Sequence, residues 1–282
     1  MEMRPSTVCA CAVCALTMNG TLLAEEIVTN PFASGVVAYD PGSNAAPGFT
    51  NALTALGSPE RVTGELAGFP GVTSPFNPAF GTDEIVSIGS GGFLTVEFEQ
   101  AIRDDAGNPF GIDFLIFGNA GFIDTGFPDG VIGDPPGIFG VGGEATVQVS
   151  ANGLDWVTVE TRALDLMPTL GYLDSGPFDP IPGSIETDFT RPVDPSITLD
   201  DLAGLSMSQI VDLYDGSGGG VGFDLAGTGL SEVSFIRVLN QSALAFEIDA
   251  FADVSVPSPG GVALLAPPGV FMLCRRRRSA SL

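Results

Sequence analysis

The clearest periodic segment of this chain is Phe93-Leu94-Thr95-Val96-Glu97-Phe98-Glu99, at the centre of residues 91–102. Leu94, Val96 and Phe98 alternate with the other residues, and successive side chains of a β-strand point to opposite faces of its sheet. The pattern therefore predicts a strand with Leu94, Val96 and Phe98 in a hydrophobic core.

Other short segments separated by Gly, Pro, Asn and Asp are also typical of strands. Residues 112–117 form a dense apolar run, which predicts a central strand. Residues 145–150 and 156–160 flank Asn152-Gly153, a dipeptide typical of β-hairpin turns. The last two predicted strands are residues 233–239 and 243–251, and in the second of these Phe246, Ile248 and Ala250 alternate with Glu247 and Asp249.

One short helix is predicted at Ser206–Tyr214, because Ser206 is a good N-cap and Gln209 stands three residues later. Two long irregular segments, residues 119–143 and 162–200, are expected to be functional or disordered loops. These elements together predict an all-β fold, a single jelly-roll β-sandwich with one short helix and long loops.

Both ends of the chain have the character of export signals. Residues 1–24 combine Arg4, an apolar run and a small-residue end, which predicts a secretory signal peptide. Residues 256–282 hold Val256-Pro257-Ser258-Pro259, an apolar stretch and Arg275-Arg276-Arg277-Arg278. Each apolar run is shorter than the roughly 20 residues that a membrane-spanning helix needs. One domain is therefore expected between residues 25 and 255.

The C-terminal order of proline motif, apolar segment and arginine cluster resembles the PEP-CTERM sorting signal, with Ser258 where that family has Glu. Val256, Pro257, Pro259 and Arg275–Arg278 carry the resemblance. It implies an exported bacterial protein that contacts the membrane transiently, is processed by an exosortase-type enzyme, and resides at the cell surface or outside the cell.

Composition excludes several classes of partner. The chain has 10 basic and 34 acidic residues and no His, and five of the basic residues lie in the two terminal signals (Arg4 and Arg275–Arg278). Nucleic acid is a poor partner for so acidic a surface, whereas divalent cations suit it. The acidity also suits solubility in a salty or extracellular setting. The four Cys all lie in the terminal segments, so no disulfide or thiol chemistry is expected between residues 25 and 255.

Residues 104–113 form the best candidate metal site. Asp104, Asp105, Asn108 and Asp113 supply carboxylate and amide oxygens, which Ca²⁺ prefers, although their spacing does not match an EF-hand. The alternative is an ordinary turn in which Asp and Asn bond to the backbone. Asp224 follows a Gly-rich loop, and it either caps or orients that loop or shares a cation with another carboxylate.

Catalysis is not expected. Without His, Lys or a Cys outside the terminal segments, the Ser-His-Asp, Cys-His and Schiff-base mechanisms are closed, and zinc lacks imidazole ligands. A two-carboxylate glycosidase mechanism remains open. Its available acids are Glu144, Asp155, Glu160 and Glu186, and nothing marks a pair among them.

Aromatic residues give one candidate for ligand binding. Tyr172 lies in a predicted loop and can serve as an exposed platform for a sugar ring, since amphipathic aromatic rings tolerate water. Trp156, at the start of a predicted strand, is expected to pack in the core instead.

Several segments together resemble exported bacterial surface proteins with a discoidin-like, galactose-binding-type jelly roll. The most specific is Val149-Ser150-Ala151-Asn152-Gly153-Leu154-Asp155-Trp156, which is similar to a strand-turn-strand pattern of discoidin domains. The other segments are residues 83–96, 108–120, 222–226 and 247–254. The resemblance implies this fold and carbohydrate or surface-polymer binding, and it implies no catalysis.

Three functions are consistent with these observations. The first is non-catalytic binding of extracellular or surface polysaccharide, with Ca²⁺ as the candidate cofactor. The second is a purely structural role in the envelope or biofilm matrix, for which acidity and a sorting signal suffice. A two-carboxylate glycoside hydrolase is the third.

Overall fold

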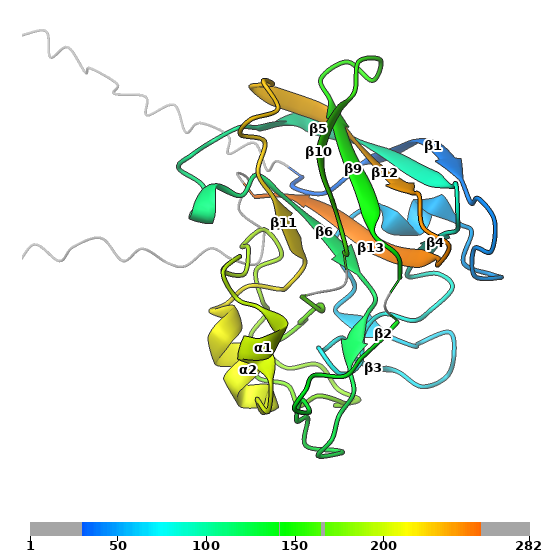
Figure 1. The fold of residues 1–282 in the computed structure, drawn as a ribbon. Coiled ribbons are helices and arrows are strands. Elements are labelled where there is room, and N and C mark those ends of the chain that lie inside the picture. Colours follow the sequence, from blue (N-terminus) through cyan, green and yellow to red (C-terminus); the bar gives the residue numbers. More distant parts are fainter. Residues whose placement is uncertain (1–29, 141, 165–166, 255–282) are drawn as a thin grey trace, which may run out of the picture.

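Strand β5 (Phe93–Arg103) lies in one sheet of an antiparallel β-sandwich (Figure 1). The computed structural model describes residues 30–140, 142–164 and 167–254. Both predicted export signals, including Val256, Pro257, Pro259 and Arg275–Arg278, lie outside these residues. Within them, no helix has the length and apolar character needed to cross a membrane.

The first sheet has five strands in the order β1-β5-β12-β9-β10, and neighbouring strands are antiparallel. Its other members are β1 (Gly35–Asp40), β9 (Ala145–Ser150), β10 (Val157–Arg162) and β12 (Glu232–Asn240). The predicted hairpin at Asn152-Gly153 is confirmed, because β9 and β10 pair across it.

The second sheet has four strands in the order β11-β6-β13-β4, again antiparallel. They are β4 (Val86–Ile88), β6 (Phe114–Gly118), β11 (Val221–Phe223) and β13 (Phe246–Asp253). The predicted central strand is therefore confirmed as β6, which has a neighbour on each side.

The main core lies between the two sheets. Leu94, Val96 and Phe98 are buried in it, as their alternation predicts. The all-β sandwich is thus confirmed, while the jelly-roll connection of its strands stays a prediction.

The alternation predicted for the last strand is wrong at one point. The register of β13 shifts between Ile248 and Ala250, so Phe251 enters the main core and Ala250 packs on the outer face of the sheet. Because a bulge adds one residue to a strand, it reverses the facing of the residues that follow it. Asp249 is buried at this bulge.

A third layer covers the outer face of the four-stranded sheet, below the two sheets in Figure 1. We call residues 60–85, 119–140, 142–143, 163–164 and 167–220 the loop layer. It has its own hydrophobic core, which includes Phe76, Phe122 and Tyr214. Its short elements are β2 (Val62–Thr63), β3 (Gly71–Val72), β7 (Gly121–Phe122), β8 (Ile138–Phe139), α1 (Leu199–Leu202) and α2 (Met207–Tyr214).

The predicted helix is confirmed as α2, and the backbone N–H of Ser206 donates to Gln209 Oε1 (2.9 Å) at its start. Met207, Ile210 and Tyr214 bury one face of the helix in the loop-layer core. Helix α1 was not predicted. The described part of the chain also has 3-10 helices at Ala52–Ala55 and Pro109–Gly111.

Candidate functional site

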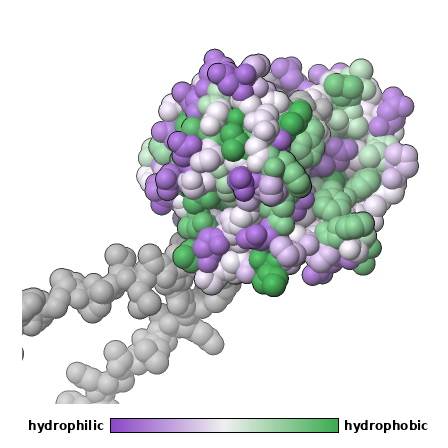
Figure 2. All heavy atoms as spheres, turned by 90° about the horizontal axis from the view of Figure 1, so that it is seen from below, coloured by the Kyte–Doolittle hydropathy of each residue, from purple (hydrophilic) through white to green (hydrophobic). Residues whose placement is uncertain are grey.

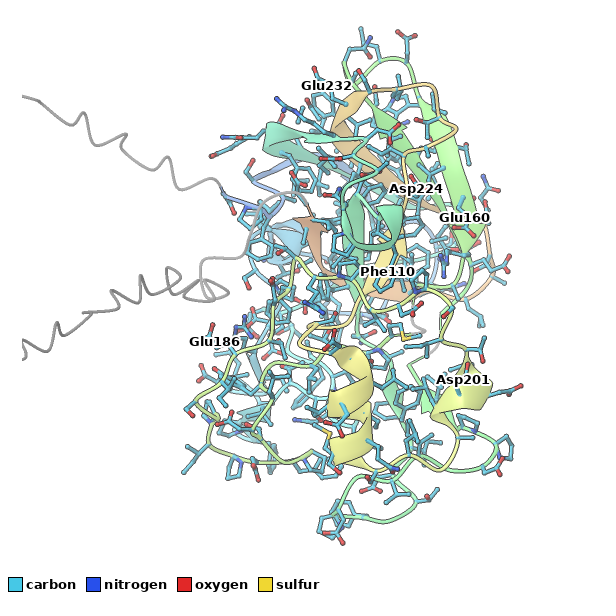
Figure 3. The ribbon with its side chains drawn as sticks, turned by 90° about the vertical axis from the view of Figure 1, so that its left-hand side faces the viewer. Phe110, Glu160, Glu186, Asp201, Asp224 and Glu232 are labelled. Carbon is cyan, nitrogen blue, oxygen red and sulfur yellow. The ribbon has the colours of Figure 1, made fainter. Side chains whose placement is uncertain are left out.

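The acidic segment 104–113 leaves the end of β5 and turns back to β6. Phe110 and Gly111 both have positive φ (58° and 72°), and this left-handed turn returns the chain toward Asp104. The turn brings together one carboxylate oxygen each from Asp104, Asp113 and Asp224, all within 4.8 Å of one another. Asp224 and Phe110 lie on the side that faces the viewer in Figure 3.

Asp113 is the buried centre of this cluster, with 0% of its surface exposed. Its Oδ1 accepts from the backbone N–H of Asp105 (3.0 Å) and from Asn108 Nδ2 (3.0 Å), and its Oδ2 accepts from the N–H of Leu225 (2.8 Å). Burial raises the pKa of Asp113, these hydrogen bonds oppose the rise, and the charge of Asp224 adds to it. Oδ2 retains one lone pair for a further partner.

The predicted metal residues thus divide into two roles. Asp104 and Asp113 converge, and Asp224 joins them from a distant segment. Asp105 Oδ1 instead accepts from the N–H of Gly107 (2.8 Å), so this carboxylate closes a local turn. Asn108 donates to Asp113 and orients it.

Three carboxylates at this separation repel one another, and a bound cation would relieve that repulsion. Oxygen donors from three acidic side chains, two of them exposed, suit Ca²⁺, which accepts flexible geometry and completes its shell with water. Among the described residues, these three Asp residues form our candidate cation site.

Tyr172 lies within the loop layer and is half-buried. Its ring is 5.8 Å from the guanidinium carbon of Arg61, which also lies 4.1 Å from the ring of Phe189. Arg61 donates to the carbonyls of Gly171 and Thr187 and pairs with Glu186 (3.5 Å). Tyr172 is therefore only partly exposed, and its ring packs against the Arg61 guanidinium.

Trp156 does not pack in the core as predicted. It is half-buried on the outer face of the five-stranded sheet, where its ring lies 3.8 Å from the guanidinium carbon of Arg237. Arg237 Nε donates to Thr95 Oγ1 (3.1 Å), which fixes the stack on the sheet. Val157 lies opposite Val149, which faces the core, so Val157 points to the same side. Trp156 directly precedes Val157 and therefore points to the outer face, because successive side chains of a strand alternate.

The four acids considered for glycoside hydrolysis occupy separate places. Glu160 pairs with Arg162 (3.3 Å) and Glu186 pairs with Arg61, and Figure 3 shows these two glutamates well apart. Asp155 accepts from Asn152 Nδ2 (3.0 Å) in the β9–β10 turn. Glu144 is exposed just before β9.

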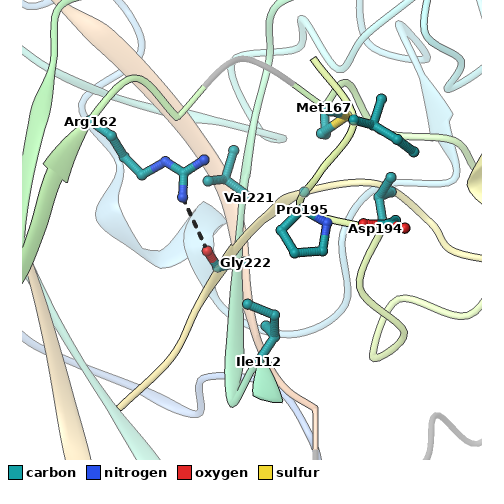
Figure 4. Close-up of a pocket in the computed structure, with 10 residues that line it drawn as sticks. Ile112, Arg162, Met167, Asp194, Pro195, Val221 and Gly222 are labelled. Carbon is teal, nitrogen blue, oxygen red and sulfur yellow. Dashed lines mark hydrogen bonds between the residues drawn. The ribbon is translucent and has the colours of Figure 1, made fainter. Parts of the chain in front are cut away.

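A small cavity lies beside β11, between Arg162 and the segment that carries Asp194 and Pro195 (Figure 4). Arg162 donates to the carbonyl of Gly222 across it (3.5 Å). Its volume of about 50 Å³ is far below the roughly 300–1,000 Å³ of usual ligand pockets, so this cavity is too small for a sugar.

Compared with known proteins, this chain matches no family model and no curated protein. The resemblances described above therefore rest on the residues that carry them.

Proposed function

We propose that this chain is an exported bacterial protein of the cell surface or extracellular matrix, whose β-sandwich binds polysaccharide without catalysing a reaction. The observation that carries the proposal is the loop layer, in which long segments form an ordered surface with exposed apolar side chains. Rigid scaffolds commonly carry binding residues on such loops.

Internal hydrogen bonds hold this surface in place. Asp124 accepts from the N–H groups of Gly126 and Val131, each at 2.8 Å. Asp174 accepts from the N–H groups of Ser184 and Ile185. A preorganised surface loses little conformational entropy when it binds a ligand.

The surface offers apolar contact area. Phe69 and Phe127 are 78% and 75% exposed, and Phe127 lies 5.3 Å from the ring of Phe178. A groove of about 480 Å³ lies in the same loop layer, between Pro177 and helix α2. Figure 2 views the molecule from this side and shows apolar patches separated by polar side chains. Scattered apolar patches on an otherwise polar face suit a polymer that carries both C–H faces and hydroxyls.

Calcium is the proposed cofactor, bound by Asp104, Asp113 and Asp224. A cation there would tie the segment after β5 to the segment after β11 and stabilise that edge of the sandwich. Its contribution would be to the stability of the module.

The test is titration of the purified protein with a panel of bacterial and algal polysaccharides, in Ca²⁺ and again in EDTA. Saturable binding to at least one polymer is expected. Absence of binding in both buffers would favour a structural matrix role, and release of reducing sugar that a single Glu→Gln change abolishes would favour a glycosidase.

Export has its own test. In a bacterium that carries an exosortase, the chain is expected to reach the surface without residues 1–24 and without Arg275–Arg278, as mass spectrometry of the surface fraction can show. A variant with serine at all four C-terminal arginines is expected to remain unprocessed. A surface form that keeps the arginine cluster would contradict the proposed signal.

A further inference from the structure

A further pocket, of about 200 Å³, lies where the loop layer meets the four-stranded sheet, and it shares no lining residue with the cavity or the groove described above. Asn119 directly follows β6, Glu247 belongs to β13, and Phe80 and Ile85 precede β4. Ala46 and Phe49 complete the lining. Four separate segments of the chain therefore build it.

Asn119 gives this pocket an unsatisfied acceptor. Its side-chain Oδ1 is buried and has no hydrogen-bond partner among the described residues. Nearly all buried polar atoms in folded proteins have a partner, so this oxygen can accept a hydrogen bond from an ordered water or from a ligand hydroxyl that reaches it through the pocket.

Glu247 supplies a second acceptor. The side chain is half-buried, and burial raises the pKa of its carboxyl group while a hydrogen bond from Ser87 opposes the rise. Ser87 Oγ donates to Oε1 of Glu247 (3.0 Å), which leaves Oε2 for a ligand. The carboxylate is thus oriented before any ligand arrives.

The rim is also fixed in advance. The N–H of Ala46 donates to Ser87 Oγ (2.9 Å), and the N–H of Ser87 donates to the carbonyl of Phe49 (2.7 Å). Phe80 is 39% exposed, and its ring crosses Gly64, where a Cβ atom would lie 2.4 Å from the Phe80 ring. Gly64 therefore permits the position of this aromatic wall.

We propose that this pocket binds one neutral sugar ring, which deepens the proposed polysaccharide binding by locating the ligand. Two of the lining residues carry an acceptor oxygen, Asn119 Oδ1 and Glu247 Oε2, and such acceptors fit the hydroxyl donors of a sugar. The walls formed by Phe49, Phe80 and Ile85 fit its C–H face. The lining contains a carboxylate and no basic residue, which disfavours uronates, sulfates and phosphates.

The size of the pocket agrees with a single ring. Drug-sized ligands occupy pockets of about 300–1,000 Å³, and this pocket is smaller. An affinity for one monosaccharide on the order of 1 mM is expected, since few contacts are available.

The first measurement is titration of the isotopically labelled protein with galactose, glucose, mannose and glucuronate, followed by the NMR signal of the Asn119 side-chain amide. A saturable shift with at least one neutral sugar, and none with glucuronate, is expected. Ethanolamine is included because an ammonium group also fits two acceptors. A shift with ethanolamine alone, or with no ligand at all, would overturn the proposal.

The second measurement compares variants for affinity and stability. Asn119→Leu removes the unsatisfied acceptor, so it is expected to lower affinity about tenfold or more while the melting temperature is unchanged or higher. Phe80→Ala is expected to weaken binding, whereas Leu154→Ala is the control, because Leu154 is an exposed apolar residue of the β9–β10 turn and lies outside both the pocket and the loop layer. A folded Asn119→Leu protein that binds the sugar as tightly as wild type would also overturn the proposal.

These results separate the pocket from the proposed function. Polysaccharide binding that is unaffected by Asn119→Leu and Phe80→Ala would leave the module's function intact and move its site elsewhere. Sugar binding in the pocket without retention of any polymer would instead support the pocket and contradict polymer binding.

Discussion

Asp249 and Glu60 hold carboxyl groups where the fold disfavours their charge. Asp249 is buried, and it accepts from the backbone N–H of Glu60 (3.1 Å). Burial raises the pKa of Asp249 well above its usual range. Burial, followed by the charges of Glu84, Asp83 and Glu65, raises the pKa of Glu60 to about 7. The folded protein therefore keeps protons that the unfolded chain releases in mild acid.

Glu60 makes stability depend on pH. The ordinary pKa of a Glu carboxyl is 4.5, and that of Glu60 in the folded protein is about 7. The protonated carboxyl therefore contributes its full share to the free energy of unfolding below about pH 4.5, and this contribution is lost as pH rises through about 7. We expect the free energy of unfolding to fall between pH 5 and 8, and Glu60→Gln to reduce that fall by about 1–2 kcal/mol, given partial solvent screening. Urea unfolding at pH 5, 6.5 and 8 measures it. Exposed Glu99→Gln is the control, and equal pH slopes for Glu60→Gln and wild type would contradict the assignment.

The proposed calcium site predicts different effects for substitutions of the neighbouring residues Asp104 and Asp105. Saturating Ca²⁺, at about 100 times its dissociation constant, should stabilise the protein by about 2.7 kcal/mol, measured as a rise in melting temperature. Asp104→Asn should remove most of this rise, because it removes a converging charge. Asp105→Asn should retain it, since Asp105 closes a local turn and Asn can replace it there. An equal response in both variants would rule out the three-aspartate site.

At the scale of the elements, the β9–β10 hairpin depends on one backbone conformation. Gly153 has a φ of 73°, and Asn152 Oδ1 accepts from the N–H groups of Leu154 and Asp155 (each 2.9 Å). Gly153→Ala should lower the free energy of unfolding by about 1–2 kcal/mol, because a Cβ atom disfavours left-handed backbone. Gly153→Asn should lower it less, as Asn tolerates this region. Urea unfolding measures the free energy of unfolding of both variants. Equal decreases for Gly153→Ala and Gly153→Asn would contradict the prediction, because they would show that the backbone conformation at Gly153 does not determine the loss.

Elements such as this hairpin can be predicted from the sequence because local signals determine them. Strand β5, the hairpin and helix α2 follow from local periodicity, turn chemistry and capping. The bulge in β13 does not, because alternation continues through Ile248 and Ala250 and only the pairing with β6 shifts. The order of the loop layer also escapes prediction, since it depends on long-range contacts such as those of Arg61 with residues 171–189.

The candidate site divides in the same way. The acidic segment 104–113 is visible as a local cluster, whereas its third member, Asp224, depends on the pairing of β11 with β6. Asn119 and Glu247 carry no sequence signal as pocket residues, because each is one polar residue beside a strand. Only the fold places these two acceptors in the same pocket.

At the scale of the whole molecule, charge opposes the compact state. The formal net charge is −24 at pH 7, and the described residues hold few arginines to offset it. Arg61, Arg162 and Arg191 are ion-paired, and each offsets one acidic side chain. Most acidic side chains therefore repel one another across the surface, and this repulsion is relieved when the protein unfolds and expands.

Salt should therefore stabilise this protein. Raising NaCl from about 10 mM to about 150 mM shortens the screening length from about 30 Å to about 8 Å. If screening recovers about 1 kcal/mol, the melting temperature should rise by roughly 2–4 °C. CaCl₂ at equal ionic strength should raise it further, and Asp104→Asn should remove that excess while leaving the NaCl response intact. A melting temperature that falls in NaCl would mean that the three arginine pairs outweigh the general repulsion, because salt weakens attraction and repulsion alike.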